Sequence, residues 1–325
     1  MLMIDLLKIL VLNSETIEFF KNSNLLVWSK DSEKLANEYT GEIHSKEERS
    51  YKGILFCFYE KKLEIIFKPH YFFNNNFHNA NDFTVIDCIN ILKSFISIFN
   101  IEDLEDYKII NLEFGIICIS PIPIRDLITF IYCHSKNIFI NSSDDLRYSK
   151  ISSSSNQNGE ANKYKRIKAY AKSLQFPDDC DKDTFRFEVK SKRTKYIKNL
   201  GINNLSDLLN ENIYNTLAKN ILKEFDDMLI LYPISDFGNL NEKEINKLKD
   251  YLNTHTWYKF SQKSRNTFNN NKIAYNRLLD KAGYNIHKEL RKVIEDKLMY
   301  LLNCADSTYI NTGNCTILVN ETTKV

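Results

Sequence analysis

The chain lacks three features that would point to familiar classes of protein. It has no glycine-rich phosphate-binding loop, which argues against an ATP-driven enzyme such as a helicase. Its seven cysteines are scattered without a CxxC pair or zinc-ligand spacing, which is typical of reduced core thiols in a cytosolic protein. Apolar runs such as Ile109–Ile124 are interrupted by polar residues and prolines before they reach the ~20 residues of a membrane span. We therefore expect neither a transmembrane helix nor a membrane partner.

The first segment also lacks the features of a secretion signal. Residues 1–13 are apolar but include Asp5 and Lys8, and they have neither a basic leader nor a small-residue cleavage site. We expect this segment to be the first β-strand of a cytoplasmic protein.

The composition is that of a globular protein whose positive charge is unevenly distributed. The 325 residues are 43% apolar and 13% aromatic, enough for one sizeable core and a smaller second one, and the net charge is only +2. Between residues 163 and 198, however, twelve Lys and Arg stand against five acids, and Tyr251–Leu279 has five Lys and Arg, several aromatics and no acid. Cations hold phosphates and aromatic faces stack on unpaired bases, so both segments suit DNA. The alternative is a solvated helix face whose aromatics belong to the core.

The hydrophobic pattern up to residue 200 predicts an α+β domain with an antiparallel sheet. A Ser-, Asn- and Gly-rich stretch, Asn141–Asn162, is typical of an exposed loop. The predicted strands are Tyr51–Tyr59 and Lys62–Lys68, paired as a hairpin, Tyr107–Ile119 and Asp183–Lys192. The predicted helices are one capped by Asn81 or Asp82 and one over Ile124–Ser135.

After Gly201 the pattern becomes helical. We therefore expect two parts: residues 1–200 with the sheet, and a mainly helical C-terminal subdomain, residues 201–325, that can contact DNA. The helical spacing covers Asn212–Leu231, Asn241–Asn253, Thr256–Ala282 and His287–Asn303.

Three residues are candidate metal ligands. His70 and His78 flank a polar turn at the end of a predicted strand, where two imidazoles can bind a divalent cation. Glu113 is an acid within an apolar strand, and burying it is costly unless it is paired or bound to a metal. The alternatives are satisfied or surface histidines and an ion pair between Glu113 and a neighbouring Lys.

Tyr170 stands between two lysines at alternate positions. If this segment is extended, Lys168, Tyr170 and Lys172 project from the same side. A phenol with a pKa near ~10 is a poor nucleophile at neutral pH, and neighbouring cations favour its anion. The alternative is a tyrosine packed beside solvated lysines.

Three ordered segments resemble the filamentous-phage gene II replication protein family. They are Leu63–Ile65 with the turn that ends Phe77-His78-Asn79, then Ile167–Gln175 around Tyr170, and then Phe185–Lys190 followed by Tyr196–Gly201. The acid-containing strand Asn111–Gly115 lies between the first two, and Trp257–Gly283 resembles a later segment of the family.

The resemblance implies a relative of the His-hydrophobic-His endonucleases, with an antiparallel sheet that carries the site. Tyr170 matches the nucleophile and Lys172 the lysine two positions on, while His78 and Asn79 match a His-Asn pair. The chain has no strict His-x-His triplet, so His70 is the partner ligand only by its proximity. Glu113 matches an acidic position and completes a site for Mg²⁺ or Mn²⁺. Arg186 and Glu188 are expected to be a structural strand pair.

The expected function is a rolling-circle replication initiator in the cytoplasm of a bacterial host. It would nick single-stranded or supercoiled origin DNA through a 5′-phosphotyrosyl intermediate, rejoin the strands later, and work with a host polymerase and helicase. The alternative is a non-catalytic DNA-binding module that controls copy number in a phage or plasmid. The predicted DNA contacts are Asn79, Arg166, Lys168, Lys190, Lys192, Arg193, Trp257 and Arg265.

Overall fold

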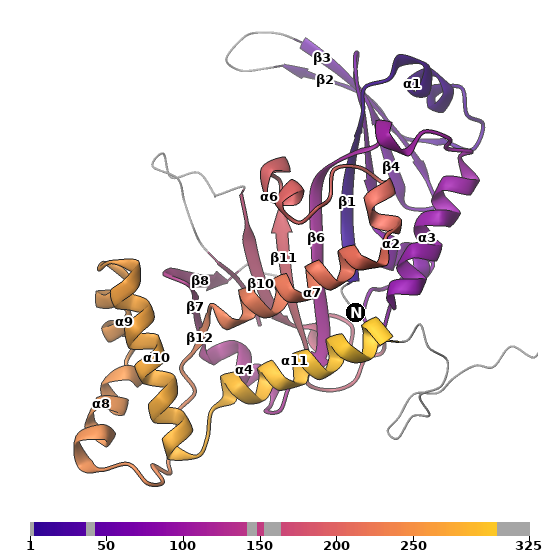
Figure 1. The fold of residues 1–325 in the computed structure, drawn as a ribbon. Helices are drawn as coiled ribbons and strands as arrows, with labels where there is room; N and C mark the ends of the chain where they lie inside the picture. The colour runs from indigo at the N-terminus through magenta and orange to yellow at the C-terminus, as the bar shows by residue number, and fades with distance from the viewer. Residues whose placement is uncertain (1–2, 37–42, 142–147, 153–163, 304–325) are drawn as a thin grey trace, which may run out of the picture.

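A computed structural model describes residues 3–36, 43–141, 148–152 and 164–303 of the chain (Figure 1). Its centre is a 12-stranded sheet with the order β12-β7-β8-β9-β10-β11-β6-β1-β5-β4-β3-β2, in which neighbouring strands are antiparallel. The α+β class with an antiparallel sheet is thus confirmed. The strands are β1 (Met3–Val11), β2 (Val27–Ala36), β3 (Ile43–Tyr51), β4 (Ile54–Phe58), β5 (Leu63–Phe67), β6 (Lys108–Ile119), β7 (Ile131–His134), β8 (Asn137–Asn141), β9 (Ser149–Ser152), β10 (Arg166–Ala171), β11 (Thr184–Ser191) and β12 (Met228–Ile230).

Most strands predicted from the sequence are present near their expected bounds. The first strand, the hairpin of β4 and β5, and the long strands β6 and β11 are confirmed. The predicted strand Tyr51–Tyr59 is wrong at its start, because Tyr51 ends β3. Lys52 and Gly53 follow with positive φ angles of 43° and 80° and form a turn before β4. A two-residue hairpin turn of this kind needs left-handed backbone, which glycine adopts without strain.

Two strands, β7 and β12, lie where the sequence predicted helices. The predicted helix Ile124–Ser135 ends at Phe130, and the chain continues as β7. The strand β12 interrupts the helical region after Gly201 and pairs with β7. In both places the sequence has helical spacing, but such spacing reflects only neighbouring residues. Pairing with other strands of the sheet determines the structure instead. The expected loop Asn141–Asn162 lies mostly outside the described residues, although part of it forms β9.

The helix after the hairpin starts later than predicted. Thr84, and neither Asn81 nor Asp82, caps α3, because its hydroxyl accepts from Asp87 N while the Asp87 carboxylate accepts from Thr84 N. This is a capping box. The helices are α1 (Ser14–Lys21), α2 (Pro69–Phe73), α3 (Val85–Ile98), α4 (Ile124–Phe130), α5 (Lys172–Gln175), α6 (Thr194–Asn199), α7 (Glu211–Asp226), α8 (Glu242–Leu252), α9 (Thr254–Ser261), α10 (Arg265–Ala282) and α11 (Ile286–Asn303), with 3₁₀ turns η1 (Leu104–Asp106) and η2 (Ser206–Leu209).

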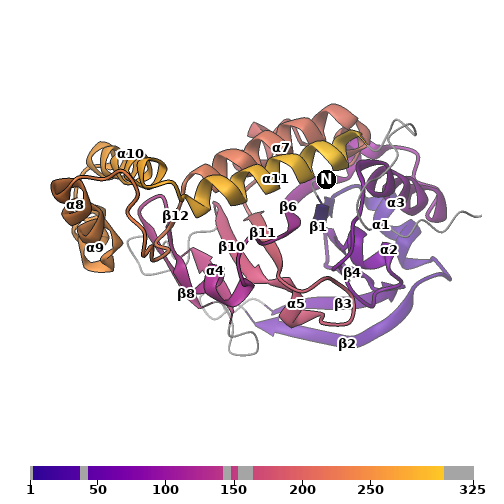
Figure 2. The same cartoon turned by 90° about the horizontal axis from the view of Figure 1, so that it is seen from below.

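The main core lies between the sheet and the helices α7 and α11. Figure 2 shows these two helices side by side along one face of the curved sheet, with α5 on the other side. Leu217 of α7 and Ile294 of α11 belong to the same buried cluster as Phe114 of β6 and Val189 of β11. The hydrophobic core therefore continues across the boundary that we expected at residue 200.

A second, smaller core holds α8, α9 and α10 together (Figure 1). Trp257 is at its centre and is fully buried, packed edge-on against Phe268 and Tyr275. Its indole N–H donates to Tyr251 O at 2.6 Å. This cluster packs against Leu229 of β12, so it is attached to the far edge of the sheet.

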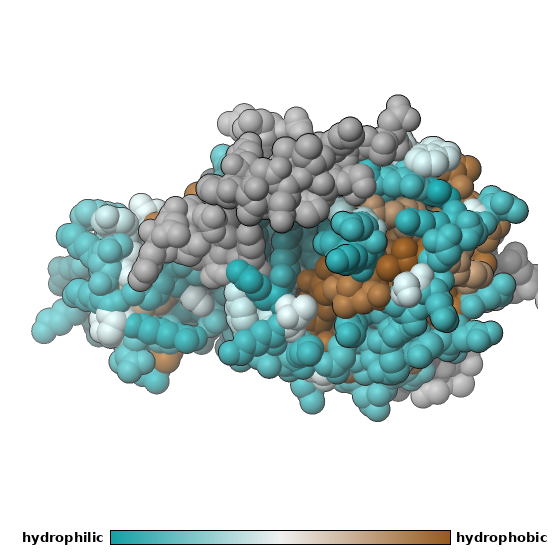
Figure 3. All heavy atoms as spheres, turned by 90° about the horizontal axis from the view of Figure 1, so that it is seen from above, coloured by the Kyte–Doolittle hydropathy of each residue, from teal (hydrophilic) through white to brown (hydrophobic). Residues whose placement is uncertain are grey.

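Exposed apolar side chains gather at the opposite end of the molecule. Figure 3 shows apolar residues concentrated on the upper face over this end. The exposed apolar residues of this region are Leu12, Phe19, Leu25, Val27 and Trp28, in α1, its flanking loops and the start of β2.

Among the described residues, no helix combines the length and the apolar character needed to cross a lipid bilayer.

His287 of α11 makes the stability of the main core depend on pH. Its ring stacks on Phe225, and Nε2 lies 3.1 Å from Phe225 O. Burial, together with the charge of Lys272, lowers the pKa of His287 from 6.5 to about 4. In the unfolded chain the ring binds its proton near pH 6.5, so the free energy of unfolding falls as the pH is lowered from 6.5 through 4. The loss is on the order of 3 kcal/mol.

We predict that His287→Gln, which keeps an N–H donor for Phe225 O, has a smaller loss of stability between pH 7 and pH 4 than the wild type. Urea unfolding at both pH values measures the difference. The same pH dependence in the two proteins would contradict this assignment.

Candidate active site on the polar face of the sheet

The sheet face opposite α7 carries charged side chains on three adjacent strands. In β11 the apolar residues Phe185, Phe187 and Val189 face the main core, and the residues between them therefore face the other way. The register pairs Tyr170 with Arg186, Lys168 with Glu188, and Lys190 with Glu113. Residues from β10, β11 and β6 thus form a continuous polar surface.

Glu188 is the hub of this surface. Tyr170 donates its hydroxyl to Glu188 Oε1 at 2.6 Å, and Arg186 Nε donates to the same oxygen at 2.8 Å. Lys168 Nζ lies 3.3 Å from Glu188 Oε2. Burial alone would raise the pKa of Glu188, but the charges of Arg186 and Lys168 hold it below its usual value. Glu188 is therefore an anion that accepts three hydrogen bonds.

Gly115 provides the space for this carboxylate. It lies opposite Glu188 in the register of β6 and β11. A Cβ at position 115 would stand 2.9 Å from Glu188 Cγ and even closer to Phe187 O. The absence of a side chain at Gly115 therefore lets Glu188 reach Tyr170 in its observed position.

Tyr170 is protonated in this arrangement. Burial and the charge of Glu188 raise the pKa of its hydroxyl well above 10. We expected the neighbouring lysines to favour the phenolate, but Lys168 is engaged by two carboxylates, Glu113 and Glu188. The expectation is corrected: Tyr170 donates a hydrogen bond to Glu188, and Lys168 and Arg186 pair with Glu188 instead of stabilising a phenolate.

Glu113 takes part in ion pairs. Lys168 Nζ lies 2.9 Å from Glu113 Oε1, and Lys190 contacts the other carboxylate oxygen. This is the alternative that the sequence left open for Glu113. Its two oxygens face ammonium groups, which does not fit the metal-ligand role predicted for it.

Lys172 and Asn79 extend the network to β1. Lys172 Nζ donates to Asn79 Oδ1 at 2.5 Å and to Gln175 Oε1 at 2.8 Å, and Asn79 Nδ2 donates to Asp5 Oδ1 at 3.2 Å. Asp5 in turn pairs with Arg186. Burial lowers the pKa of Lys172 to about 8, so it is mostly charged at neutral pH but releases its proton readily. Tyr170, Lys172 and Asn79, singled out from the sequence, therefore lie together.

The two candidate histidines have different surroundings. His70 is fully buried, and its Nε2 donates at 2.8 Å to the amide oxygen of Asn81, which also accepts from Asn74 Nδ2. His70 Nδ1 makes no hydrogen bond and lies 3.9 Å from Asp5 Oδ1. Burial lowers the pKa of His70 to about 3, so the ring is neutral. His78 is half-buried, with its Nε2 3.6 Å from Asp179.

The expected ligand set His70, His78 and Glu113 is therefore not brought together. Of this set, His70 fits a divalent cation, together with Asp5, which the sequence did not single out. The buried Nδ1 of His70 carries a lone pair and faces the Asp5 carboxylate, and such ions bind both nitrogen and oxygen ligands of these kinds. Among the described residues, the His, Cys, Asp and Glu side chains that approach closely enough to form a three-ligand group are in another place, around His134.

The predicted DNA contacts fall into two groups. Arg166 and Lys190 lie opposite one another on the polar surface, and Lys192 and Arg193 are exposed where β11 ends and α6 begins. The prediction that Trp257 contacts DNA is wrong, because this residue is buried in the second core and its faces cannot stack on bases. The remaining candidate, Arg265, is exposed at the start of α10.

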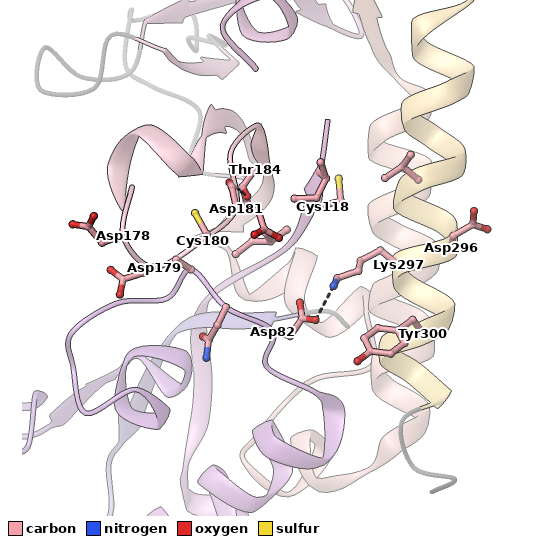
Figure 4. Close-up of a pocket in the computed structure, with 15 residues that line it drawn as sticks. Asp82, Cys118, Asp178, Asp179, Cys180, Asp181, Thr184, Asp296, Lys297 and Tyr300 are labelled. Carbon is pink, nitrogen blue, oxygen red and sulfur yellow. Dashed lines mark hydrogen bonds and ion pairs between the residues drawn. The ribbon is translucent and has the colours of Figure 1, made fainter. Parts of the chain in front are cut away.

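A cavity of about 920 Å³ lies elsewhere, between the ends of β6 and β11 and the helix α11. Figure 4 shows Asp82 pointing to Lys297 of α11, at 2.7 Å, with Asp178, Asp179 and Asp181 on the opposite wall. Tyr170 does not line this cavity. The charged groups of the polar surface and this cavity are thus separate features.

Asp5, Arg186 and Glu188 are central to the network, although the sequence did not single out Asp5 and indicated a structural role for the other two. The sequence does carry a signal: each is a charged residue between two apolar neighbours in a strand, and burial is costly without a partner. The reasoning that singles out Glu113 therefore holds equally for the Phe-Arg-Phe-Glu-Val segment of β11.

Searches of protein-family models, curated proteins and solved structures found no match to this chain. The resemblance to the gene II family therefore stays a prediction, and the function must be inferred from the residues.

We predict that Arg186→Met destabilises the protein strongly. It removes the cation between two buried carboxylates, Asp5 and Glu188, and breaking a buried ion pair costs about 3–5 kcal/mol. Denaturant unfolding measures the change. Lys281→Met, which breaks the exposed pair with Glu244, is the control and should have far less effect. Equal effects of the two substitutions would contradict the role given to Arg186.

Proposed function

We propose that the protein is a DNA-nicking and strand-joining enzyme of the rolling-circle initiator type, with Tyr170 as its nucleophile. The observation that carries the proposal is the 2.6 Å hydrogen bond from the Tyr170 hydroxyl to the ionised Glu188. A nucleophile, a proton acceptor in contact with it, and a third group that orients the acceptor form the arrangement that nucleophilic catalysis requires. Here Arg186 is the orienting group.

The reaction balances with the groups present. Tyr170 Oη attacks the phosphorus of a phosphodiester, and its proton passes to Glu188 Oε1. A bond forms between Oη and phosphorus, and the bond from phosphorus to the 3′-oxygen breaks. The products are a 5′-phosphotyrosyl link and, once it is protonated, a 3′-hydroxyl. Attack by a 3′-hydroxyl on the link reverses the reaction and joins strands without ATP.

Lys172 is the cation best placed to meet the phosphate. Its ammonium lies 5.6 Å from the centre of the Tyr170 ring, and its partners are the neutral amides of Asn79 and Gln175. Lys168, in contrast, is held by two carboxylates. Lys172 can therefore exchange its present partners for a phosphate at a lower cost in free energy than Lys168. It can then stabilise the charge that develops on the phosphate and donate a proton to the leaving 3′-oxygen.

A divalent cation such as Mg²⁺ or Mn²⁺, when bound, would polarise the scissile phosphate. His70 Nδ1 and Asp5 are the residues of this network that fit it. Arg166 and Lys190, followed by Lys192 and Arg193 at the end of β11, would hold the DNA backbone on one side of Tyr170 by charge.

A non-catalytic DNA-binding module is the second candidate, and one observation favours it. Lysines and an arginine pair with Glu113 and Glu188, and Tyr170 as a residue is only 8% exposed. Such a closed network can also be purely structural, with the cations at the end of β11 binding DNA.

The decisive experiment incubates the protein with labelled single-stranded DNA of its own replicon, with Mn²⁺ or with EDTA, and examines it on a denaturing gel. We expect a metal-dependent protein–DNA adduct that Tyr170→Phe abolishes, because the phenylalanine lacks the attacking oxygen. Tyr164→Phe is the matched control, since Tyr164 is the nearby exposed tyrosine and should be dispensable. DNA binding without any adduct would favour the binding module.

A further inference from the structure

Three ligand-type side chains meet where α7 ends and β7 turns into β8, away from the Tyr170 network. His134 is the last residue of β7, Glu224 is in the last turn of α7, and Asp227 is the C-cap of that helix. One ligand atom from each lies within 4.8 Å of the others. His134 and Glu224 are each only 3% exposed, so this is not a set of solvated surface groups.

The histidine nitrogen that faces the cluster lacks a hydrogen bond. His134 Nε2 is buried and lies 3.0 Å from Glu224 Oε2, but the two atoms do not form a hydrogen bond of acceptable geometry. Buried polar atoms whose contacts lack good hydrogen-bond geometry are rare in native proteins and call for an explanation. A cation that is shared by the ring nitrogen and the carboxylate would provide one.

The backbone holds the cluster in place independently of any ligand. His134 pairs with Met228 in the register of β7 and β12. Ser135 N donates to Asp227 O at 2.8 Å, and Ser135 Oγ donates to Asp227 Oδ2 at 3.1 Å. The ligand atoms are therefore fixed by strand pairing and by the end of α7, as a preorganised metal site requires.

An ammonium group currently neutralises part of the cluster. Lys165 Nζ lies 2.6 Å from Glu224 Oε2, the same oxygen that faces His134. Lys165 is partly exposed and directly precedes β10, so its side chain can leave for solvent. Two other cations lie nearby. Lys272 donates to the backbone carbonyl of Asp226 and also interacts with the charge of Asp227, while Arg291 pairs with the Asp226 carboxylate. Lys165 is thus the competitor of a metal ion at this site.

We propose that His134, Glu224 and Asp227 bind a divalent transition-metal ion of the Zn²⁺ class, which displaces Lys165. One imidazole nitrogen and two carboxylate oxygens are three protein ligands of types that Zn²⁺ accepts, with further positions left for water. The ion would link β7 to the end of α7 at the point where the chain enters β12 and continues to the second core. The site is independent of the proposed reaction at Tyr170.

The test titrates the full chain, after removal of metals with EDTA, with Zn²⁺ alone and measures the heat of binding. We expect a Zn²⁺ site that is lost, or weakened at least ~10-fold, in His134→Ala and in Asp227→Asn, since each removes a ligand. His255→Ala removes an exposed histidine of α9 and should bind like the wild type. Tyr170→Phe should also keep the site, which separates this result from that of the nicking assay.

Lys165→Ala gives a prediction that a purely structural ion pair would not. Removing the competing ammonium should make Zn²⁺ bind severalfold more tightly, and Zn²⁺ should raise the unfolding temperature of this variant more than that of the wild type. If His134→Ala does not fold, Asp227→Asn and Lys165→Ala carry the test. The proposal would be overturned if Asp227→Asn bound Zn²⁺ as the wild type does or if Lys165→Ala had an unchanged affinity. A dissociation constant of the wild type above about 1 mM would overturn it as well.

Discussion

The buried carboxylate of Glu188 is the interaction on which the candidate site depends. It accepts hydrogen bonds from Tyr170 and Arg186 on one oxygen and pairs with Lys168 on the other. An anion at this depth persists only because these cations compensate for its lost hydration. The same cations keep Glu188 ionised, and an ionised Glu188 is what can accept the phenol proton. Stability and chemistry therefore rely on one set of contacts.

The sheet supplies the geometry of this set. Antiparallel pairing of β10, β11 and β6 places Tyr170 opposite Arg186 and Lys168 opposite Glu188, while Gly115 leaves room for the carboxylate. The helices α7 and α11 cover the apolar face, which leaves the other face free for charged groups. The second core around α8, α9 and α10 is attached at the sheet edge, and it has no residue in the Tyr170 network.

The sequence predicted the parts of the fold and of the site that depend on local pattern. The apolar run of β6 and the alternation of Phe185, Phe187 and Val189 in β11 predicted the bounds of these strands closely. Lys168 and Tyr170 face the same side of β10, as their alternate positions predicted, whereas Lys172 is the first residue of α5. What it could not predict depends on contacts between distant segments. The short strand β7 pairs with β12, which is far from it in the sequence, and with β8, which follows it after a turn. Trp257 is buried by the packing of α8, α9 and α10, which the pattern of residues around it does not indicate. The role of Glu188 follows from its partners in β10 and β11.

The most direct measurement is the rate of covalent adduct formation by folded Glu188→Gln, compared with the wild type at neutral pH on the same DNA. If Glu188 accepts the proton of Tyr170, the amide should slow the adduct by roughly 10²–10⁴-fold and leave DNA affinity nearly unchanged, and the deficit should shrink as the pH is raised. An adduct formed by Glu188→Gln at the wild-type rate would contradict the central role of this carboxylate.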